Sequence, residues 1–244
     1  MPRGILKQKG GGLALALLAG ACGGSGRAAP PSPQASASSP TDPKAIFKKA
    51  TEDLARSGQA ERAKHEGAKA PDFALPDSKG HTVRLSNLLA KGPVVLTFYR
   101  GGWCPYCNLQ LRSYQKALGE IHSLGAELVA VSPQLPDKTL STVEKAELSF
   151  PVLSDLGNRV ARSYGLVFRV SDEVVPIYKQ FGIDLEASNG DKSHELPMPG
   201  TYVIDRDGTI RSAFVDADYT KRLPVERLLE SLRALHGTAT RESP

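Results

Sequence analysis

The chain has few cysteines: three among 244 residues, at positions 22, 104 and 107. This number excludes a disulfide-rich scaffold. Cys104 and Cys107 form a Cys-x-x-Cys pair, and the sequence has no second such pair and no closely spaced pair of histidines. A structural zinc site normally draws its ligands from two such pairs, so we expect no metal.

The sequence also lacks a basic block interleaved with aromatic residues. Its net charge is only +5 and its aromatic content 6%. Most lysines and arginines stand near acidic residues, a pattern typical of a solvated surface. Nucleic-acid binding is therefore not expected.

Long apolar runs are scarce as well. The run at residues 13–19 is too short to span a bilayer as a mature helix, and it follows basic residues and ends in small ones, the order of a secretory signal. Residues 18–22 resemble a bacterial lipoprotein signal, in which Cys22 is lipidated. An ordinary cleaved signal, or a membrane anchor with an incidental cysteine, is the alternative. We expect a signal peptide at 1–21 and an exported cell-envelope protein, either a lipoprotein held at the membrane by its lipid or a periplasmic protein.

The sequence that follows divides into a tether, one folded domain and a tail. Residues 22–41 are rich in Gly, Ser, Pro and Ala, and such a segment cannot bury enough apolar surface to fold. The folded domain is expected at 42–237, and residues 238–244 are interpreted as a flexible tail.

Apolar periodicity in this domain alternates between strand and helix. Residues 93–99 are almost continuously apolar, as in a strand covered on both faces, and helical spacing follows from 104 to 122. Two further strand-then-helix units follow before residue 165. The alternation predicts an α/β fold with a central mixed sheet flanked by helices.

Shorter elements are predicted around this core. They are a short N-terminal helix starting at Asp42 and Pro43, an N-terminal hairpin at 70–85, a polar insertion at 168–197 with a short helix near 174–181, a last hairpin at 201–215, and a final helix at 224–235.

The Cys-x-x-Cys pair lies where the apolar strand gives way to the helix. Pro105 suits the first helical position, so Cys104 would lie at a helix N-terminus, where free N–H groups and the helix dipole stabilise a thiolate. Cys107 would share the same helical face and could form a disulfide with Cys104. A redox site is the interpretation, with a structural disulfide or a metal site as alternatives.

Four stretches together resemble one known family: residues 70–73, 98–107, 153–155 and 200–208. They are similar to the peroxiredoxin-like branch of the alkyl hydroperoxide reductase C/thiol-specific antioxidant (AhpC/TSA) family. The resemblance spans about residues 46–235 and implies a thioredoxin-like fold with no cofactor.

The resemblance implies a thiol-dependent peroxidase for hydrogen peroxide and organic hydroperoxides. Cys104 would attack the peroxide and become a sulfenic acid, and Cys107 would condense with it to a disulfide. Thioredoxin, or an envelope dithiol in an exported protein, would reduce that disulfide.

The sequence departs from the family pattern at several positions. Thr97 and Gly101 stand where typical members carry a Pro and a Thr, and Pro199 stands where they carry an Arg. Pro199 instead resembles the cis-proline of thioredoxin-like reductases. The alternative function is therefore an envelope thiol–disulfide oxidoreductase acting on protein disulfides.

Supporting residues are expected around the cysteines. Trp103 would pack beside the sulfur, and Pro199 and Thr201 would line the site. Arg100 could supply the missing cation, the alternative being a solvent-facing arginine at the strand end. The run 216–222 also belongs to the resemblance, but its residues indicate no role.

Overall fold

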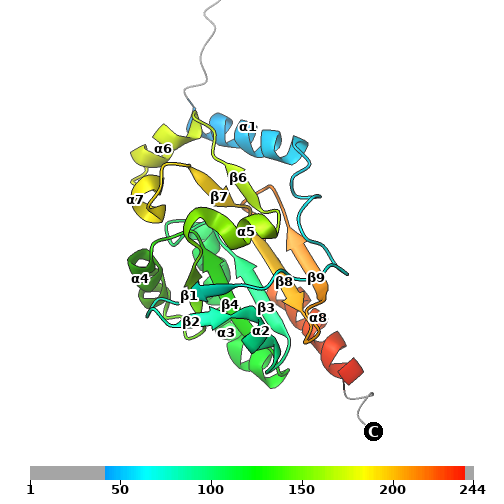
Figure 1. Cartoon of the computed structure of the whole chain (residues 1–244). Helices are drawn as coiled ribbons and strands as arrows, with labels where there is room; N and C mark the ends of the chain where they lie inside the picture. The colour runs from blue at the N-terminus through cyan, green and yellow to red at the C-terminus, as the bar shows by residue number, and fades with distance from the viewer. Residues whose placement is uncertain (1–41, 240–244) are drawn as a thin grey trace, which may run out of the picture. The chain divides into compact units, whose positions relative to one another are not determined.

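The computed structural model describes residues 42–239 (Figure 1). The predicted signal peptide, the lipidation site Cys22, the tether up to residue 41 and tail residues 240–244 lie outside the described residues. Within the described range, no helix is long and apolar enough to cross a membrane.

A five-stranded sheet forms the centre of the fold. Its strands are β3 (Val94–Phe98), β4 (Glu127–Ser132), β5 (Val152–Ser154), β8 (Gly200–Ile204) and β9 (Ile210–Val215). They lie in the order β5-β4-β3-β8-β9. The pairs β3–β4 and β4–β5 are parallel, whereas β3–β8 and β8–β9 are antiparallel. The predicted mixed sheet is confirmed, with β3 at its centre.

The other elements surround this sheet. The helices are α1 (Pro43–Arg56), α2 (Leu85–Leu89), α3 (Pro105–Ser123), α4 (Pro136–Ala146), the 3-10 turn η1 (Leu156–Asn158), α5 (Arg159–Ser163), α6 (Val174–Gln180), α7 (Leu185–Asn189) and α8 (Val225–Ala239). The remaining strands form one small hairpin, β1 (Ala74–Pro76) with β2 (Thr82–Arg84), and one two-stranded antiparallel ladder, β6 (Val167–Arg169) with β7 (Glu195–Pro197).

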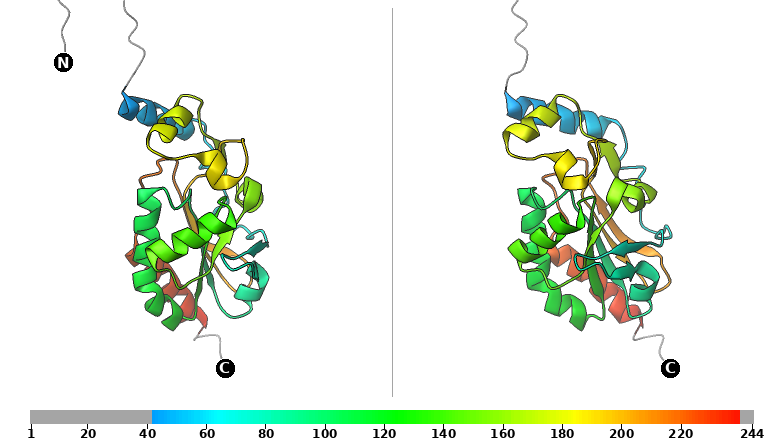
Figure 2. Two further views of the ribbon diagram at one scale, coloured as in Figure 1. Left: turned by 90° about the vertical axis from the view of Figure 1, so that its left-hand side faces the viewer. Right: turned by 60° about the vertical axis from the view of Figure 1, so that its left-hand side comes forward.

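The sheet is covered on both faces, because alternate side chains of β3 point to opposite sides. Leu96 and Phe98 join an apolar cluster with the β1–β2 hairpin and α2. Val95 joins a second cluster with α3 and α8. Figure 2 shows α3 and α8 on one side of the sheet and the β1–β2 hairpin on the other.

The N-terminal helix begins where the sequence predicts. Asp42 is its N-cap, and the Asp42 carboxylate accepts a hydrogen bond from the Lys44 N–H at 3.0 Å. None of the residues of α1 is fully buried. Phe47 and its apolar neighbours instead pack on a third cluster, formed by the insertion.

The insertion is more ordered than its composition indicates. The short helix predicted near 174–181 is α6, but β6, β7 and α7 are not predicted. The β6–β7 ladder pairs only three residues on each strand, too few to show alternation in the sequence. The last helix also extends to Ala239, beyond the predicted end at 235.

Candidate active site

The cysteine pair follows the central strand. β3 ends at Phe98, and α3 begins at Pro105 with Cys104 as its N-cap residue. The predicted helix start is therefore confirmed, with proline at the first helical position. The backbone N–H of Cys104 donates to the Gly101 carbonyl at 3.0 Å, which closes a tight turn before the helix.

The two glycines before Trp103 are required by close packing. Gly101 has a φ of 152°, and a Cβ atom there would lie 2.4 Å from Trp103 Nε1. A Cβ on Gly102 would lie 2.2 Å from the Thr142 hydroxyl oxygen. The Gly102 N–H also donates to the Gln134 side chain at 2.7 Å. A hydrogen bond and close packing therefore both fix the position of this loop.

Both cysteines of the pair are free thiols buried beneath the surface. Cys104 is 1% exposed and Cys107 is fully covered. The two thiols are hydrogen-bonded to each other, so their protonation is coupled.

An arginine far along the chain contacts the second cysteine. Arg222 Nη2 lies 3.2 Å from Cys107 Sγ, and Arg222 Nη1 donates to the carbonyls of Tyr219 and Lys221. Arg222 lies in the run 216–222, for which the sequence indicates no role. In the structure, this run brings a guanidinium to the cysteine pair. The contact places a guanidinium beside the sulfur that was expected only to resolve a disulfide.

The arginines beside the pair shift the pKa of its thiols. Burial raises the pKa of Cys107, but the hydrogen bond with Cys104 and the charges of Arg222 and Arg100 outweigh burial and lower that pKa to about 6. The hydrogen bond with Cys107, together with burial, raises the pKa of Cys104. The arginine charges therefore favour a thiolate in the pair, and the Arg222 contact is made with Cys107. The thiolate expected on Cys104 from its place at the helix N-terminus stays a prediction, and Arg222 adds a positive charge beside Cys107 that the sequence alone does not place there.

Arg100 is buried, so the solvent-facing alternative is wrong. It is 3% exposed and donates a hydrogen bond to the Tyr178 hydroxyl. Its guanidinium carbon lies 4.5 Å from the ring centre of Tyr219 and 5.2 Å from that of Trp103, within cation–π range. Tyr178 and Tyr219 were not predicted as site residues, since they come from α6 and from the loop after β9.

Trp103 is partly exposed and packs beside the cysteines. Its ring contacts both the cluster that contains Cys104 and the cluster formed by the insertion. The centres of the Trp103 and Tyr178 rings are 5.5 Å apart. Trp103 therefore connects the cysteine loop to α6.

Pro199 and Thr201 lie in different surroundings. Pro199 is buried and lines a cavity together with Arg100 and Tyr219. Thr201 lies within the sheet, where its hydroxyl is 3.0 Å from the Thr97 hydroxyl and 3.3 Å from the Tyr114 hydroxyl. Thr97 and Thr201 thus form a buried polar cluster between β3, β8 and α3.

Across residues 42–239, no group of three or more His, Cys, Asp or Glu side chains is arranged to hold a metal ion. Cys22 lies outside the described residues. The residues that the structure brings together near the sulfurs are Arg100, Trp103, Tyr178, Tyr219 and Arg222.

A Cys-x-x-Cys pair at the start of the helix after the central strand of a mixed sheet defines a thiol-based oxidoreductase with a thioredoxin-like fold. The AhpC/TSA family model matches residues 67–213, more than half of the chain, and the chain belongs to this family.

Known relatives agree with this assignment. Peroxiredoxin Q from Sedum lineare is 27% identical over 170 residues, which cover 70% of this chain and 78% of the relative. The crystal structure of peroxidoxin BcpB from Mycobacterium tuberculosis superposes with a TM-score of 0.56 at 26% identity, over 70% of this chain and 97% of that one. The thiol-disulfide oxidoreductase ResA from Halalkalibacterium halodurans is 36% identical over 101 residues, but these cover only 41% of this chain and 56% of ResA.

Proposed function

We propose that the protein is a thiol-dependent peroxidase that reduces hydrogen peroxide and organic hydroperoxides. The observation that carries this proposal is the coupled pair of Cys104 and Cys107, with arginine charges beside it, in a chain of the AhpC/TSA family. A thiolate is the form of cysteine that attacks a peroxide, and these charges favour it near neutral pH.

The first step oxidises Cys104. Its proton moves to the Cys107 thiolate, and the Cys104 thiolate then attacks one oxygen of the peroxide. The O–O bond breaks, Cys104 becomes a sulfenic acid, and the alkoxide leaves with the proton held by Cys107 as an alcohol, or as water when the substrate is hydrogen peroxide.

The second step forms the disulfide. Cys107 is again a thiolate and attacks the Cys104 sulfur, which forms the S–S bond and releases hydroxide, protonated by solvent. A thioredoxin-type dithiol returns two electrons and two protons to the pair by thiol–disulfide exchange.

We place this chemistry at the cell envelope. The support is the secretory-type N-terminus and the lipoprotein-like residues 18–22, which favour a lipid anchor on Cys22 and reduction by an envelope dithiol. If Cys22 is acylated, cells fed a labelled fatty acid should incorporate the label into the wild-type protein and not into Cys22→Ser. Equal labelling of both would contradict the anchor.

The peroxidase proposal is tested by adding stoichiometric peroxide to the reduced protein. We expect loss of the two paired thiols and formation of a disulfide between them, and both should disappear in Cys104→Ser. Lys116→Arg, a change at an exposed residue of α3 that lies outside the site and leaves the cysteines in place, is a control for handling. An unchanged peroxide rate in Cys104→Ser would contradict the proposal.

The second candidate is a thiol–disulfide oxidoreductase acting on proteins. Pro199 in the cavity wall and the partial likeness to ResA favour it. It predicts that the reduced protein cleaves insulin disulfides in a Cys104-dependent manner while peroxide consumption does not depend on Cys104. The family match over residues 67–213 makes peroxidase the stronger candidate.

A further inference from the structure

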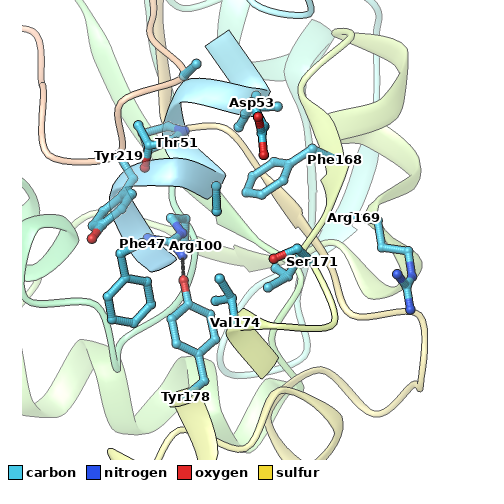
Figure 3. A pocket seen from close by; sticks show the side chains of 15 residues that line it. Phe47, Thr51, Asp53, Arg100, Phe168, Arg169, Ser171, Val174, Tyr178 and Tyr219 are labelled. Atoms are coloured by element: carbon cyan, nitrogen blue, oxygen red, sulfur yellow. Dashed lines mark hydrogen bonds between the residues drawn. The ribbon is translucent and has the colours of Figure 1, made fainter. Parts of the chain in front are cut away.

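A cavity of about 170 Å³ lies beside Arg100, between α1 and the insertion (Figure 3). Its walls are mostly apolar side chains from segments far apart in the sequence. The main apolar lining residues are Phe47, Ala50, Leu54, Phe168, Val170 and Val174. Because α1 lies before residue 67, one wall of the cavity comes from outside the segment that matches the family.

The cavity has one buried polar group with a free donor. Arg100 Nε is buried and has no hydrogen-bond partner within the described part of the chain. The other charged lining residues, Asp53 and Arg169, are paired: Asp53 with Lys49, and Arg169 with Asp172. A buried donor without a partner costs free energy unless a ligand or water satisfies it.

Arg100 also connects the cavity to the sulfurs. Its charge interacts with both Cys104 and Cys107, while its side chain forms part of the cavity wall. A molecule with a polar oxygen on Arg100 and an apolar group among Phe47 and Phe168 would have its polar end at the guanidinium whose charge acts on both cysteines.

We propose that this cavity is a specificity pocket for hydroperoxides that carry a compact, uncharged apolar group about the size of a benzene ring. The inference rests on the proposed peroxidase function. An engineered protein cavity of about 150 Å³ accommodates benzene, so the volume observed here fits a phenyl group and its immediate substituents. Arg100 Nε would donate to a peroxide oxygen, and the apolar walls would exclude water from the aryl group.

The test compares cumene hydroperoxide with hydrogen peroxide in the full-length reduced protein. Trp103 is the chain's one tryptophan and lies beside the pair, so its fluorescence in stopped flow follows oxidation directly. The measured quantity is the ratio of the second-order rate constants for the two peroxides. We expect a ratio of about ten or more for the wild type, the range that one well-fitted apolar group supplies.

Filling the cavity should lower this ratio selectively. Ala50→Phe adds a ring from the partly exposed helix α1, and we expect the ratio to fall by about tenfold. Phe168→Ala removes part of the wall on the opposite side and should also lower the ratio. A lower ratio in both variants could not be explained by misfolding of one of them. Leu140→Ala, a partly exposed residue of α4 outside the cavity, is the matched control and should leave both rate constants unchanged.

Two results separate this inference from the proposed function. If the protein reduces hydrogen peroxide through Cys104 but shows no preference for cumene hydroperoxide, or keeps its preference in both cavity variants, the pocket assignment fails and the peroxidase stands. If neither peroxide oxidises Cys104, the peroxidase proposal fails, and the pocket assignment fails with it.

Discussion

Replacing Arg222 by Gln should raise the pKa of the cysteine pair. The substitution removes a guanidinium whose Nη2 lies 3.2 Å from Cys107 Sγ. A hydrogen bond to a charged group contributes about 1.5 to 3 kcal/mol, which corresponds to about one to two pKa units. The pKa of Cys107 should therefore rise from about 6 to about 7 or 8.

The sign of the effect follows from the reacting form. A thiolate reacts and a thiol does not, so raising the pKa lowers the reactive fraction at neutral pH, here by about twofold to tenfold. The loss should vanish in alkaline buffer, where both forms of the protein are ionised. In the wild type, reactivity should fall as the pH drops through about 6.

The assay is the pH dependence of iodoacetamide alkylation in a Cys22→Ser background, where the pair supplies all the thiols. Arg227→Gln is the matched control: it removes the same charge from an exposed arginine that pairs with Glu230. It should leave the midpoint unchanged. If Arg222→Gln has the same midpoint as the control, the contact does not set the charge of the pair and the reasoning is refuted.

Further predictions concern the second cysteine and the scaffold. In Cys107→Ser, one equivalent of peroxide should convert Cys104 to a sulfenic acid that dimedone traps, with no disulfide and no turnover with a dithiol; disulfide formation within the chain would contradict this. Gly102→Ala should lower the free energy of unfolding by about 1 to 3 kcal/mol, because the added Cβ would overlap the Thr142 hydroxyl. The control is Gly119→Ala in helix α3, where an added Cβ meets no atom and should not be destabilising. Asp155→Ala removes the carboxylate that accepts hydrogen bonds from two backbone N–H groups at the start of α5. The free energy of unfolding measured in a denaturant titration should fall by about 1 to 3 kcal/mol. A smaller fall would mean that water replaces the carboxylate as the acceptor.

Much of the fold could be predicted because its signals are local. The apolar run of β3 identifies a strand buried on both faces, and Pro105 marks the start of α3. The β6–β7 ladder could not be predicted, since three-residue strands show no periodicity and their pairing joins Val167 to Pro197 across the whole insertion.

The difference between local signals and contacts between distant segments also explains which parts of the site could be predicted. Cys104 and Cys107 could be identified from their spacing and their place after a strand, both of which are local. The position of Arg222 beside Cys107 depends on how the loop after β9 returns to α3, and the hydrogen bond from Arg100 to Tyr178 depends on the insertion. The sequence therefore identifies the two sulfurs, whereas the arginine charges beside them become visible only in the structure.

Helix α1, which forms one wall of the cavity beside Arg100, should exchange its amide hydrogens early. No residue of α1 is fully buried, and Phe47 packs on Tyr178 and Phe181 at ring distances of 5.7 and 6.4 Å. A short helix with so little buried surface opens at a much lower free energy than the central strands. Its amides should exchange well before those of β3, and an apolar molecule seated against Phe47 should slow the exchange of α1 while leaving that of β3 unchanged.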